Sequence, residues 1–194
     1  MDYPATVSVE VPDRVANWRP LVHWLLAIPH LIIFEVLQHL AWLLNIVGWV
    51  AIVVTGRMPA GLADFQAMYL RYTLRLYAYV GFLHEQYPPF AFQMSAAEPG
   101  GTPVAVGFEP ELSDRNRGTV AVRLILAIPA LLFWWLTSVV ALVITVIGFF
   151  AVLFTGRWPA GLRDWLLAWY GVVLRTNAYL HLLTDEYPPF QMRA

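Results

Sequence analysis

The sequence predicts an all-α integral membrane protein made of two tandem pseudo-repeats of about 100 residues each. Of its 194 residues, 59% are hydrophobic and only 13% are charged, whereas soluble domains carry about 25% charged residues. Between Arg19 and Arg57 the only charged residue, histidines aside, is Glu35, and between Arg123 and Arg157 there is none. Because about 20 apolar residues suffice to span a bilayer, each window is long enough to cross a membrane.

The same motifs occur twice, one hundred residues apart. The segment Thr-Gly-Arg-Met-Pro-Ala-Gly-Leu at 55–62 returns as Thr-Gly-Arg-Trp-Pro-Ala-Gly-Leu at 155–162. Between 48–64 and 148–164, 10 of 17 positions are identical. The chain is therefore expected to divide into a first membrane repeat, a linker rich in turn-forming residues and a second membrane repeat, at 1–94, 95–102 and 103–194.

Each repeat is expected to begin with a short strand. Residues 5–11 and 104–109 alternate with a period of two, which is typical of strands. Since two short strands are marginally stable alone, we expect them to pair with each other on the membrane surface.

The long apolar windows, 20–54 and 120–154, come next. At about 35 residues, or roughly 52 Å of helix, each exceeds a single span of roughly 30 Å. Two interpretations remain open. An interfacial segment could break at Pro29 or Pro129 and continue as one span, or two short helices could form a hairpin that turns near 35–39 and 134–138.

A second helix follows each Gly-Pro turn, at 62–83 and 162–183. Such a helix either lies in the membrane interface or spans with a polar strip toward other helices. We favour spanning, which gives about four membrane helices in total and returns both ends of each repeat to one side. The two repeats would then be related by an axis along the membrane normal. More basic residues fall on that side, Arg193 among them, so we expect both termini to be cytoplasmic.

These motifs resemble a known family. An apolar window ending in Thr-Gly-Arg-x-Pro, a helix with Ala178-Tyr179, and Leu-Thr-Asp-Glu-Tyr-Pro-Pro-Phe at 183–190 are similar to the bacterial membrane proteins grouped as domain of unknown function 4389 (DUF4389). The first copy departs from the pattern, with Leu-His-Glu-Gln at 83–86. The resemblance implies two tandem copies and a multi-pass protein of the bacterial cytoplasmic membrane, and it implies no activity.

One polar group interrupts the first apolar window. Glu35, Gln38 and His39 lie at i, i+3 and i+4 and share a helical face, and an ionisable pair inside a membrane indicates function by default. The three side chains could form a proton relay or bind a polar ligand, or they could satisfy one another at a bend. A metal site would require more convergent ligands, so none is predicted.

The remaining histidines suggest another kind of site. His23 and His30 share a face at a spacing of seven, but opposed haem ligands come from two sides of the ring. We therefore expect interfacial histidines at both positions.

Matching charged residues occur in both copies. They could contact lipid phosphate or a partner protein, and for Arg75 and Arg175 structural pairing with an acid of the same chain is the commoner case. In copy one, Asp64 and Arg75 also share a helical face with Arg71. The residues considered for lipid or partner contact are Arg57, Asp64, Arg75, Arg157, Asp164 and Arg175.

No nucleotide-binding or hydrolase motif is present, and the net charge of −1 gives no reason to expect nucleic-acid binding. The sequence therefore favours a non-enzymatic accessory or scaffold subunit that packs against another membrane protein or itself. Two alternatives stay open. One is a lipid or small-molecule binding or transport protein with a site between the repeats, and the other is a pigment- or cofactor-associated subunit using His23, His30 or His39. No cofactor is predicted, and a bound lipid is compatible with the sequence.

Overall fold

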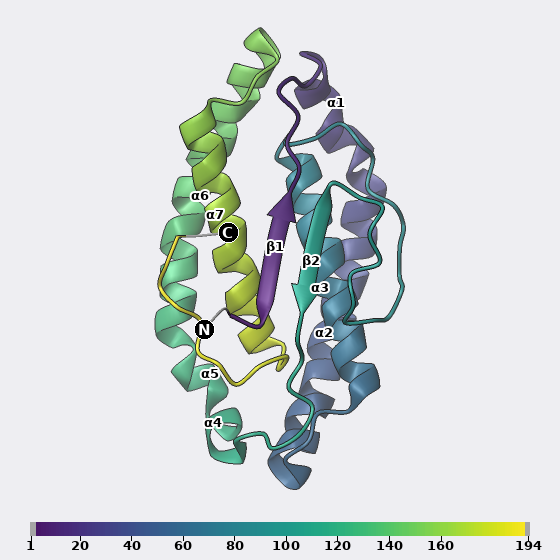
Figure 1. Ribbon diagram of the computed structural model, residues 1–194, viewed down its shortest axis with the longest axis vertical. Helices are drawn as coiled ribbons and strands as arrows, with labels where there is room; N and C mark the ends of the chain where they lie inside the picture. The colour runs from purple at the N-terminus through teal and green to yellow at the C-terminus, as the bar shows by residue number, and fades with distance from the viewer. Residues whose placement is uncertain (1–2, 193–194) are drawn as a thin grey trace.

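The computed structural model describes residues 3–192, so Arg193 lies outside the described residues. Each repeat contains a strand, one or two short helices, a 28-residue helix and a 21-residue helix (Figure 1). The elements of the first repeat are β1 (Ala5–Val9), α1 (Arg19–Leu26), α2 (Ile28–Thr55) and α3 (Ala60–Val80). Those of the second are β2 (Val104–Phe108), α4 (Arg117–Ala121), α5 (Arg123–Leu126), α6 (Ile128–Thr155) and α7 (Ala160–Leu180).

The two strands pair with each other, as the sequence predicts. They are antiparallel, with Ala5 opposite Phe108, Val7 opposite Val106 and Val9 opposite Val104. The repeats therefore run in opposite directions along the long axis, and Figure 1 shows a pseudo-twofold arrangement about the line of sight, perpendicular to the sheet.

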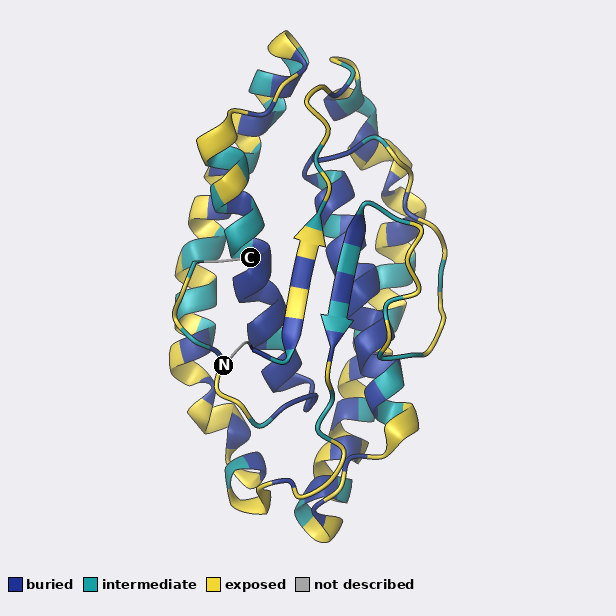
Figure 2. Ribbon diagram, viewed as in Figure 1, coloured by how far each residue is buried: buried dark blue, intermediate teal, exposed yellow. Residues whose placement is uncertain are grey.

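The helices form layers behind this sheet. β1 packs on α7 and β2 packs on α3, so each strand covers the helix of the other repeat. α2 and α6 contact α3 and α7 respectively, and they lie at the sides and rear of the molecule (Figure 1). Figure 2 shows the consequence: α3 and α7 are mostly buried, whereas α2 and α6 carry exposed residues along their length. The two repeats thus share one core.

The helix boundaries follow the proline and glycine positions. Pro29 and Pro129 stand at the start of α2 and α6, just after a break at Ala27 and Ala127. The long window is therefore a short helix, or two in the second repeat, followed by one continuous helix, and the hairpin interpretation is wrong. Both long helices end at a glycine with a left-handed backbone, φ 73° at Gly56 and 68° at Gly156, where a side chain would be strained.

The prediction of about four membrane helices is also wrong. Within residues 3–192 two helices, α2 and α6, are long and apolar enough to cross a membrane. α3 and α7 carry buried arginines and are covered by the strands, the long helices and the connecting segments. Their polar strip faces the rest of the chain, which a single sequence does not distinguish from a strip that faces other membrane helices.

Candidate functional site

The first candidate site is the exposed apolar face of α2 and α6. The side chains of α2 that point inward are mostly small or polar, at Ala41, Asn45 and Gly48. The large ones point outward: Val36 is 64% exposed on α2 and Phe154 is 75% exposed on α6. Small residues at contacts between helices and large apolar residues on the outside are typical of helices in lipid. Other exposed members of this apolar face are Ile32, Leu43, Ile46, Val54, Leu132, Trp135, Leu136, Leu142 and Val143.

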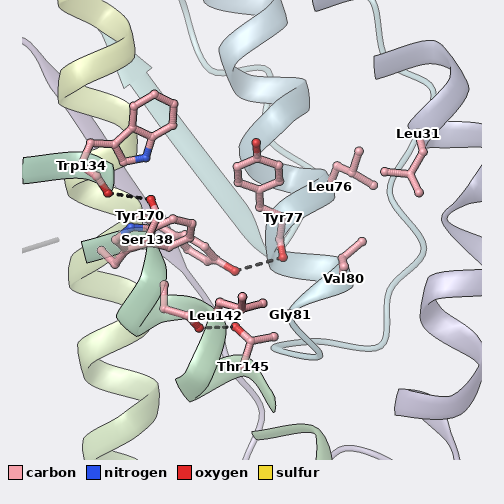
Figure 3. A pocket seen from close by; sticks show the side chains of 12 residues that line it. Leu31, Leu76, Tyr77, Val80, Gly81, Trp134, Ser138, Leu142, Thr145 and Tyr170 are labelled. Atoms are coloured by element: carbon pink, nitrogen blue, oxygen red, sulfur yellow. Dashed lines mark hydrogen bonds between the residues drawn. The ribbon is translucent and has the colours of Figure 1, made fainter. Parts of the chain in front are cut away.

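A groove of about 390 Å³ opens between the repeats (Figure 3). Its lining comes from α3, α6 and α7, with Leu31 contributed by α2. The hydroxyls of Ser138 and Thr145 donate hydrogen bonds to carbonyl oxygens of their own helix, at 2.7 and 2.8 Å. Tyr170 donates across the repeats to the carbonyl oxygen of Tyr77 at 3.0 Å. Because these hydroxyls are already satisfied, the groove presents mainly hydrocarbon to an occupant.

The polar group predicted within α2 lies on this exposed side of the helix. Glu35 and His39 are exposed and Gln38 is half-buried, and His39 Nδ1 lies 2.6 Å from the backbone oxygen of Glu35. The matching positions of α6 are Trp135, Ser138 and Val139. No group of three or more His, Asp and Glu side chains among residues 3–192 is placed to hold a metal ion.

Three predicted residues of α3 face the linker. Arg75 Nη2 lies 2.6 Å from Glu98 Oε1, and Arg71 Nε lies 3.1 Å from Glu98 Oε2. Asp64 Oδ1 accepts a hydrogen bond of 2.9 Å from the backbone N–H of Ala96. The shared face of these three side chains, expected from their spacing, therefore binds the connection between the repeats to α3.

The matching residues of the second repeat have different surroundings. Arg175 donates a 2.7 Å hydrogen bond to the carbonyl oxygen of Gln191, so it holds the C-terminal segment as Arg75 holds the linker. Asp164 is exposed and pairs with the neighbouring Arg163 at 3.0 Å. Arg57 and Arg157 are exposed in their turns, so their guanidinium groups are accessible from outside the protein.

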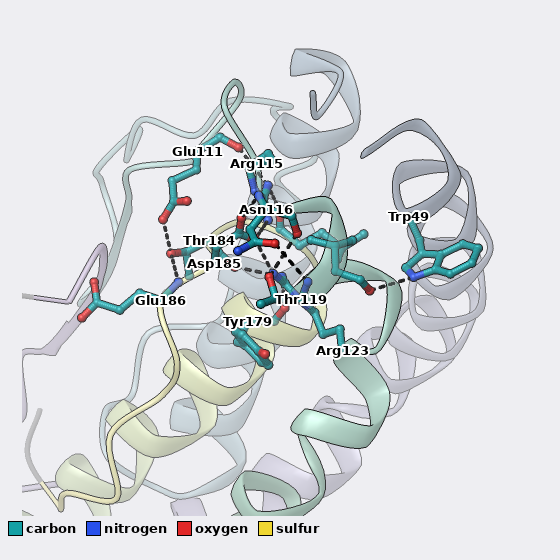
Figure 4. Close-up of polar contacts among 12 residues, drawn as sticks. Trp49, Glu111, Arg115, Asn116, Thr119, Arg123, Tyr179, Thr184, Asp185 and Glu186 are labelled. Carbon is teal, nitrogen blue, oxygen red and sulfur yellow. Dashed lines mark hydrogen bonds and ion pairs between the residues drawn. The ribbon is translucent and has the colours of Figure 1, made fainter. Parts of the chain in front are cut away.

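A second ion-pair cluster lies at the end of α7, and the sequence analysis did not single it out. We call Arg115, Arg123, Tyr179, Thr184 and Asp185 the arginine corner (Figure 4). Arg115 Nη2 lies 2.6 Å from Asp185 Oδ1, and Arg123 binds the same oxygen. Arg123 also donates to the carbonyl oxygens of Tyr179 and Thr184, and its guanidinium lies 4.3 Å from the centre of the Tyr179 ring.

The charge of Asp185 is favoured by this arrangement. Burial raises the pKa of its carboxyl group, but hydrogen bonds from Arg115 and from the backbone N–H of Asn116, with the two positive charges, outweigh burial. The net effect holds the pKa of Asp185 below its usual value of 3.8. The corner is therefore ionised at neutral pH and fastens the end of α7 to the segment before α6.

The equivalent place in the first repeat is the histidine corner, made of Arg19, His23, Tyr79, His84 and Glu85. His23 Nδ1 lies 2.8 Å from the carbonyl oxygen of Tyr79, and its ring stacks on the Tyr79 ring at 4.0 Å. Glu85 accepts from the backbone N–H of Ala16 at 2.5 Å and lies 3.4 Å from Arg19. Burial lowers the pKa of His23, and it lowers the pKa of His84 to about 4.

The histidines predicted to be interfacial are instead buried. His23 and His30 both have 0% exposure, since each fits against α3. His30 Nδ1 lies 2.6 Å from the Tyr72 hydroxyl, and its ring stacks on Phe90 at 4.1 Å. The Tyr-Pro-Pro-Phe segment thus packs back on its own repeat.

Comparison with known families agrees with this duplicated architecture. The family model described as "Domain of unknown function (DUF4389)" matches residues 17–91 and again residues 117–191. The chain belongs to the DUF4389 family. Neither the curated proteins nor the solved structures contain a match to it.

The two DUF4389 matches cover the helices and omit the linker and the strands. The linker supplies Glu98, the partner of Arg71 and Arg75, which sequence reasoning missed. A lone acid in a turn-rich linker gives little signal, because nothing in its spacing connects it to arginines more than 20 residues earlier. The arginine corner had a weak signal, since Arg123 stands where His23 stands in the first repeat.

Proposed function

We propose that this DUF4389 protein is a non-enzymatic, membrane-embedded scaffold or accessory subunit that packs against another membrane protein or a copy of itself. The supporting observation is the apolar face of α2 and α6. Exposed apolar side chains along two 28-residue helices, on a chain with 13% charged residues, are stable in lipid or against another apolar surface. The polar clusters within residues 3–192 mainly fasten segments of the chain to one another, which favours a structural role.

Membrane embedding is tested by fractionation. The full chain should sediment with membranes, resist alkaline carbonate and dissolve only in detergent. Recovery in the soluble fraction as a monodisperse species would overturn the proposal.

The scaffold role is tested by gentle solubilisation followed by native mass spectrometry. We expect a stoichiometric complex with a second copy or with another membrane protein. A monodisperse monomer without a protein partner would contradict this role while leaving membrane embedding intact.

The groove favours a second candidate, a lipid-binding protein. It lies between the repeats, is lined mainly by hydrocarbon and has room for part of an acyl chain. We expect wild-type protein to retain a lipid through detergent exchange, and the variant Ser138→Trp, which fills the groove, to lose it. The surface variant Val143→Trp is the matched control and should retain the lipid. Equal retention by all three proteins would exclude the groove as the site.

A further inference from the structure

We propose that the protein does not cross the bilayer but lies flat in one leaflet, with α2 and α6 parallel to the membrane plane and the strand pair in water. This inference rests on membrane embedding as proposed above, and it assigns the apolar face of α2 and α6 to a single lipid surface. The alternative places the long axis of the molecule along the membrane normal.

The strand pair argues against the crossing orientation. β1 and β2 run alongside α3 and α7 near the middle of the long axis (Figure 1). If α2 and α6 crossed the bilayer, the strands would lie at the depth of the hydrocarbon core. Open sheet edges exposed to lipid do not occur at that depth, because their backbone groups lose water without gaining partners.

The side chains around the strands agree with water. Thr6 and Ser8 are exposed on β1. Beside β2, the carboxylate of Glu98 accepts a 2.8 Å hydrogen bond from the backbone N–H of Val106. The neighbouring Gly100 and Gly101 are also exposed, so a crossing orientation would place irregular polar backbone in lipid.

The symmetry of the fold supports the flat orientation. The pseudo-twofold axis is perpendicular to the sheet, so it places α2 and α6 on equivalent sides of the molecule, away from the strands (Figure 1). The strand pair packs mainly on α3 and α7. The groove between the repeats is lined by α6 and α7, by α3, and by Leu31 of α2 (Figure 3). One leaflet can therefore contact both helices at once, with the axis along the membrane normal.

Helix length points the same way. Both α2 and α6 have 28 residues, or about 42 Å of helix, against a hydrocarbon core of about 30 Å. Crossing would require strong tilt or bilayer thickening, whereas a helix in the membrane plane has no length to match.

Exposed arginines border this face at both ends. The backbone N–H of Arg115 bonds to Gly56, which brings exposed Arg57 and Arg117 to one end. The backbone N–H of Val15 bonds to Gly156 and brings Arg14 and Arg157 to the other. Crossing would divide these four charges equally between the two sides of the membrane, which gives no orientation signal. Lying flat, all four can reach lipid phosphate, for which the guanidinium group is suited.

The chain contains no cysteine, so single-cysteine variants label cleanly. The test uses Arg57→Cys, Arg157→Cys and Ser8→Cys in sealed membrane vesicles of one known orientation, prepared from expressing cells. A membrane-impermeant maleimide is added from the outside to right-side-out and to inverted vesicles. We expect all three thiols to react from the same side, because the two turns and the strand pair contact the same aqueous phase.

Val143→Cys is the matched control on the apolar face, and it should react only after detergent is added. Complete labelling of every variant in detergent establishes that each thiol is reactive. Reaction of Arg57→Cys and Arg157→Cys from opposite sides, or protection of Ser8→Cys from both sides, would overturn the flat orientation without affecting membrane embedding. Absence of the protein from the vesicles would instead overturn the proposed function.

Discussion

The arginine corner and the histidine corner occupy equivalent places in the two repeats and have different chemistry. In the first repeat, His23 contacts the carbonyl oxygen of Tyr79 near the end of α3 and stacks on the Tyr79 ring. In the second repeat, Arg123 makes the same two contacts with Tyr179 near the end of α7. Arg123 does so as a cation with Asp185 as its counter-ion, whereas His23 is buried and its pKa is lowered. The carbonyl oxygen near the end of the helix thus has a side-chain partner in both repeats, with an ion pair in one and without it in the other.

The largest difference in stability between the two corners should come from removing the Asp185 carboxylate, which Arg115 and Arg123 share. Asp185→Asn leaves Arg115 and Arg123 buried, with side-chain exposures of 0% and 2%, and without their counter-ion. Loss of one partner of a buried pair costs about 3–5 kcal/mol. We expect a fall of about 3 kcal/mol in the free energy of unfolding, because carbonyl oxygens still accept from both guanidinium groups. Denaturant unfolding in detergent measures it, and a change below about 1 kcal/mol would contradict the structural importance of the corner.

A second difference between the repeats lies where α2 and α6 meet the Gly-Arg-x-Pro turns. A Cβ added at Gly148 would lie 1.9 Å from the indole of Trp158, whereas one at Gly48 would lie 3.2 Å from the sulfur of Met58. The indole is rigid and its N–H is bonded to Phe82, while a thioether adapts. Gly148→Ala should therefore destabilise by about 2–3 kcal/mol and Gly48→Ala by under about 1 kcal/mol. Equal shifts in thermal midpoint would contradict this contrast.

The pH dependence of stability should distinguish the corners more mildly. Because the pKa of His84 is lowered to about 4 in the folded protein, the unfolded chain takes up a proton first as the pH falls. The contribution of His84 to the stability of the folded protein is therefore fully present above about pH 6.5, and it is lost as the pH falls from about 6.5 to 4. In the arginine corner the folded pKa of Asp185 is below 3.8, so its contribution is lost only at lower pH.

Replacing His84 with the residue of the second repeat tests this difference. His84→Thr should weaken the dependence of the unfolding midpoint on pH between 6.5 and 4. His181, whose pKa burial also lowers to about 4, remains in the variant, so the slope should decrease without vanishing. An unchanged slope would show that His84 is not the titrating group.

The smallest effect is expected from the acid that matches Asp185. Glu85 is 38% exposed and lies 3.4 Å from Arg19, and such a pair contributes about 1 kcal/mol or less. Glu85→Gln should thus change the free energy of unfolding far less than Asp185→Asn, since the amide oxygen still accepts from Ala16. A loss as large as that of Asp185→Asn would remove the distinction between the corners.

The sequence predicted the parts of the fold that depend on local pattern. The repeat, the two strands and their pairing, and the Gly-Pro turns follow from periodicity or from residues with restricted backbones. The break before Pro29 was one of two interpretations that the sequence left open. The number of membrane spans was overestimated because the apolar and aromatic sequences of α3 and α7 are compatible both with a membrane-spanning helix and with a helix buried in the protein core. Only tertiary contacts show that the strands cover them.

The polar residues were harder to assign for a related reason. The common face of Asp64, Arg71 and Arg75 was correct, because helical spacing determines it. Their contacts with Glu98 and Ala96 depend on how the linker returns to α3, which no spacing encodes. His23 was predicted to be interfacial because the residues around it in the sequence are apolar. Its side chain is buried because α3 packs against it, which the sequence of this window does not indicate.

The pairing of β1 with β2 also constrains how the protein is made. Residues 5–9 leave the ribosome almost one hundred residues before their partners at 104–108. At roughly 5–20 residues per second, the first strand waits for several seconds without the strand that completes it. During that interval the edge of β1 is unpaired. Pairing with β2 of a neighbouring chain therefore competes with pairing to β2 of the same chain.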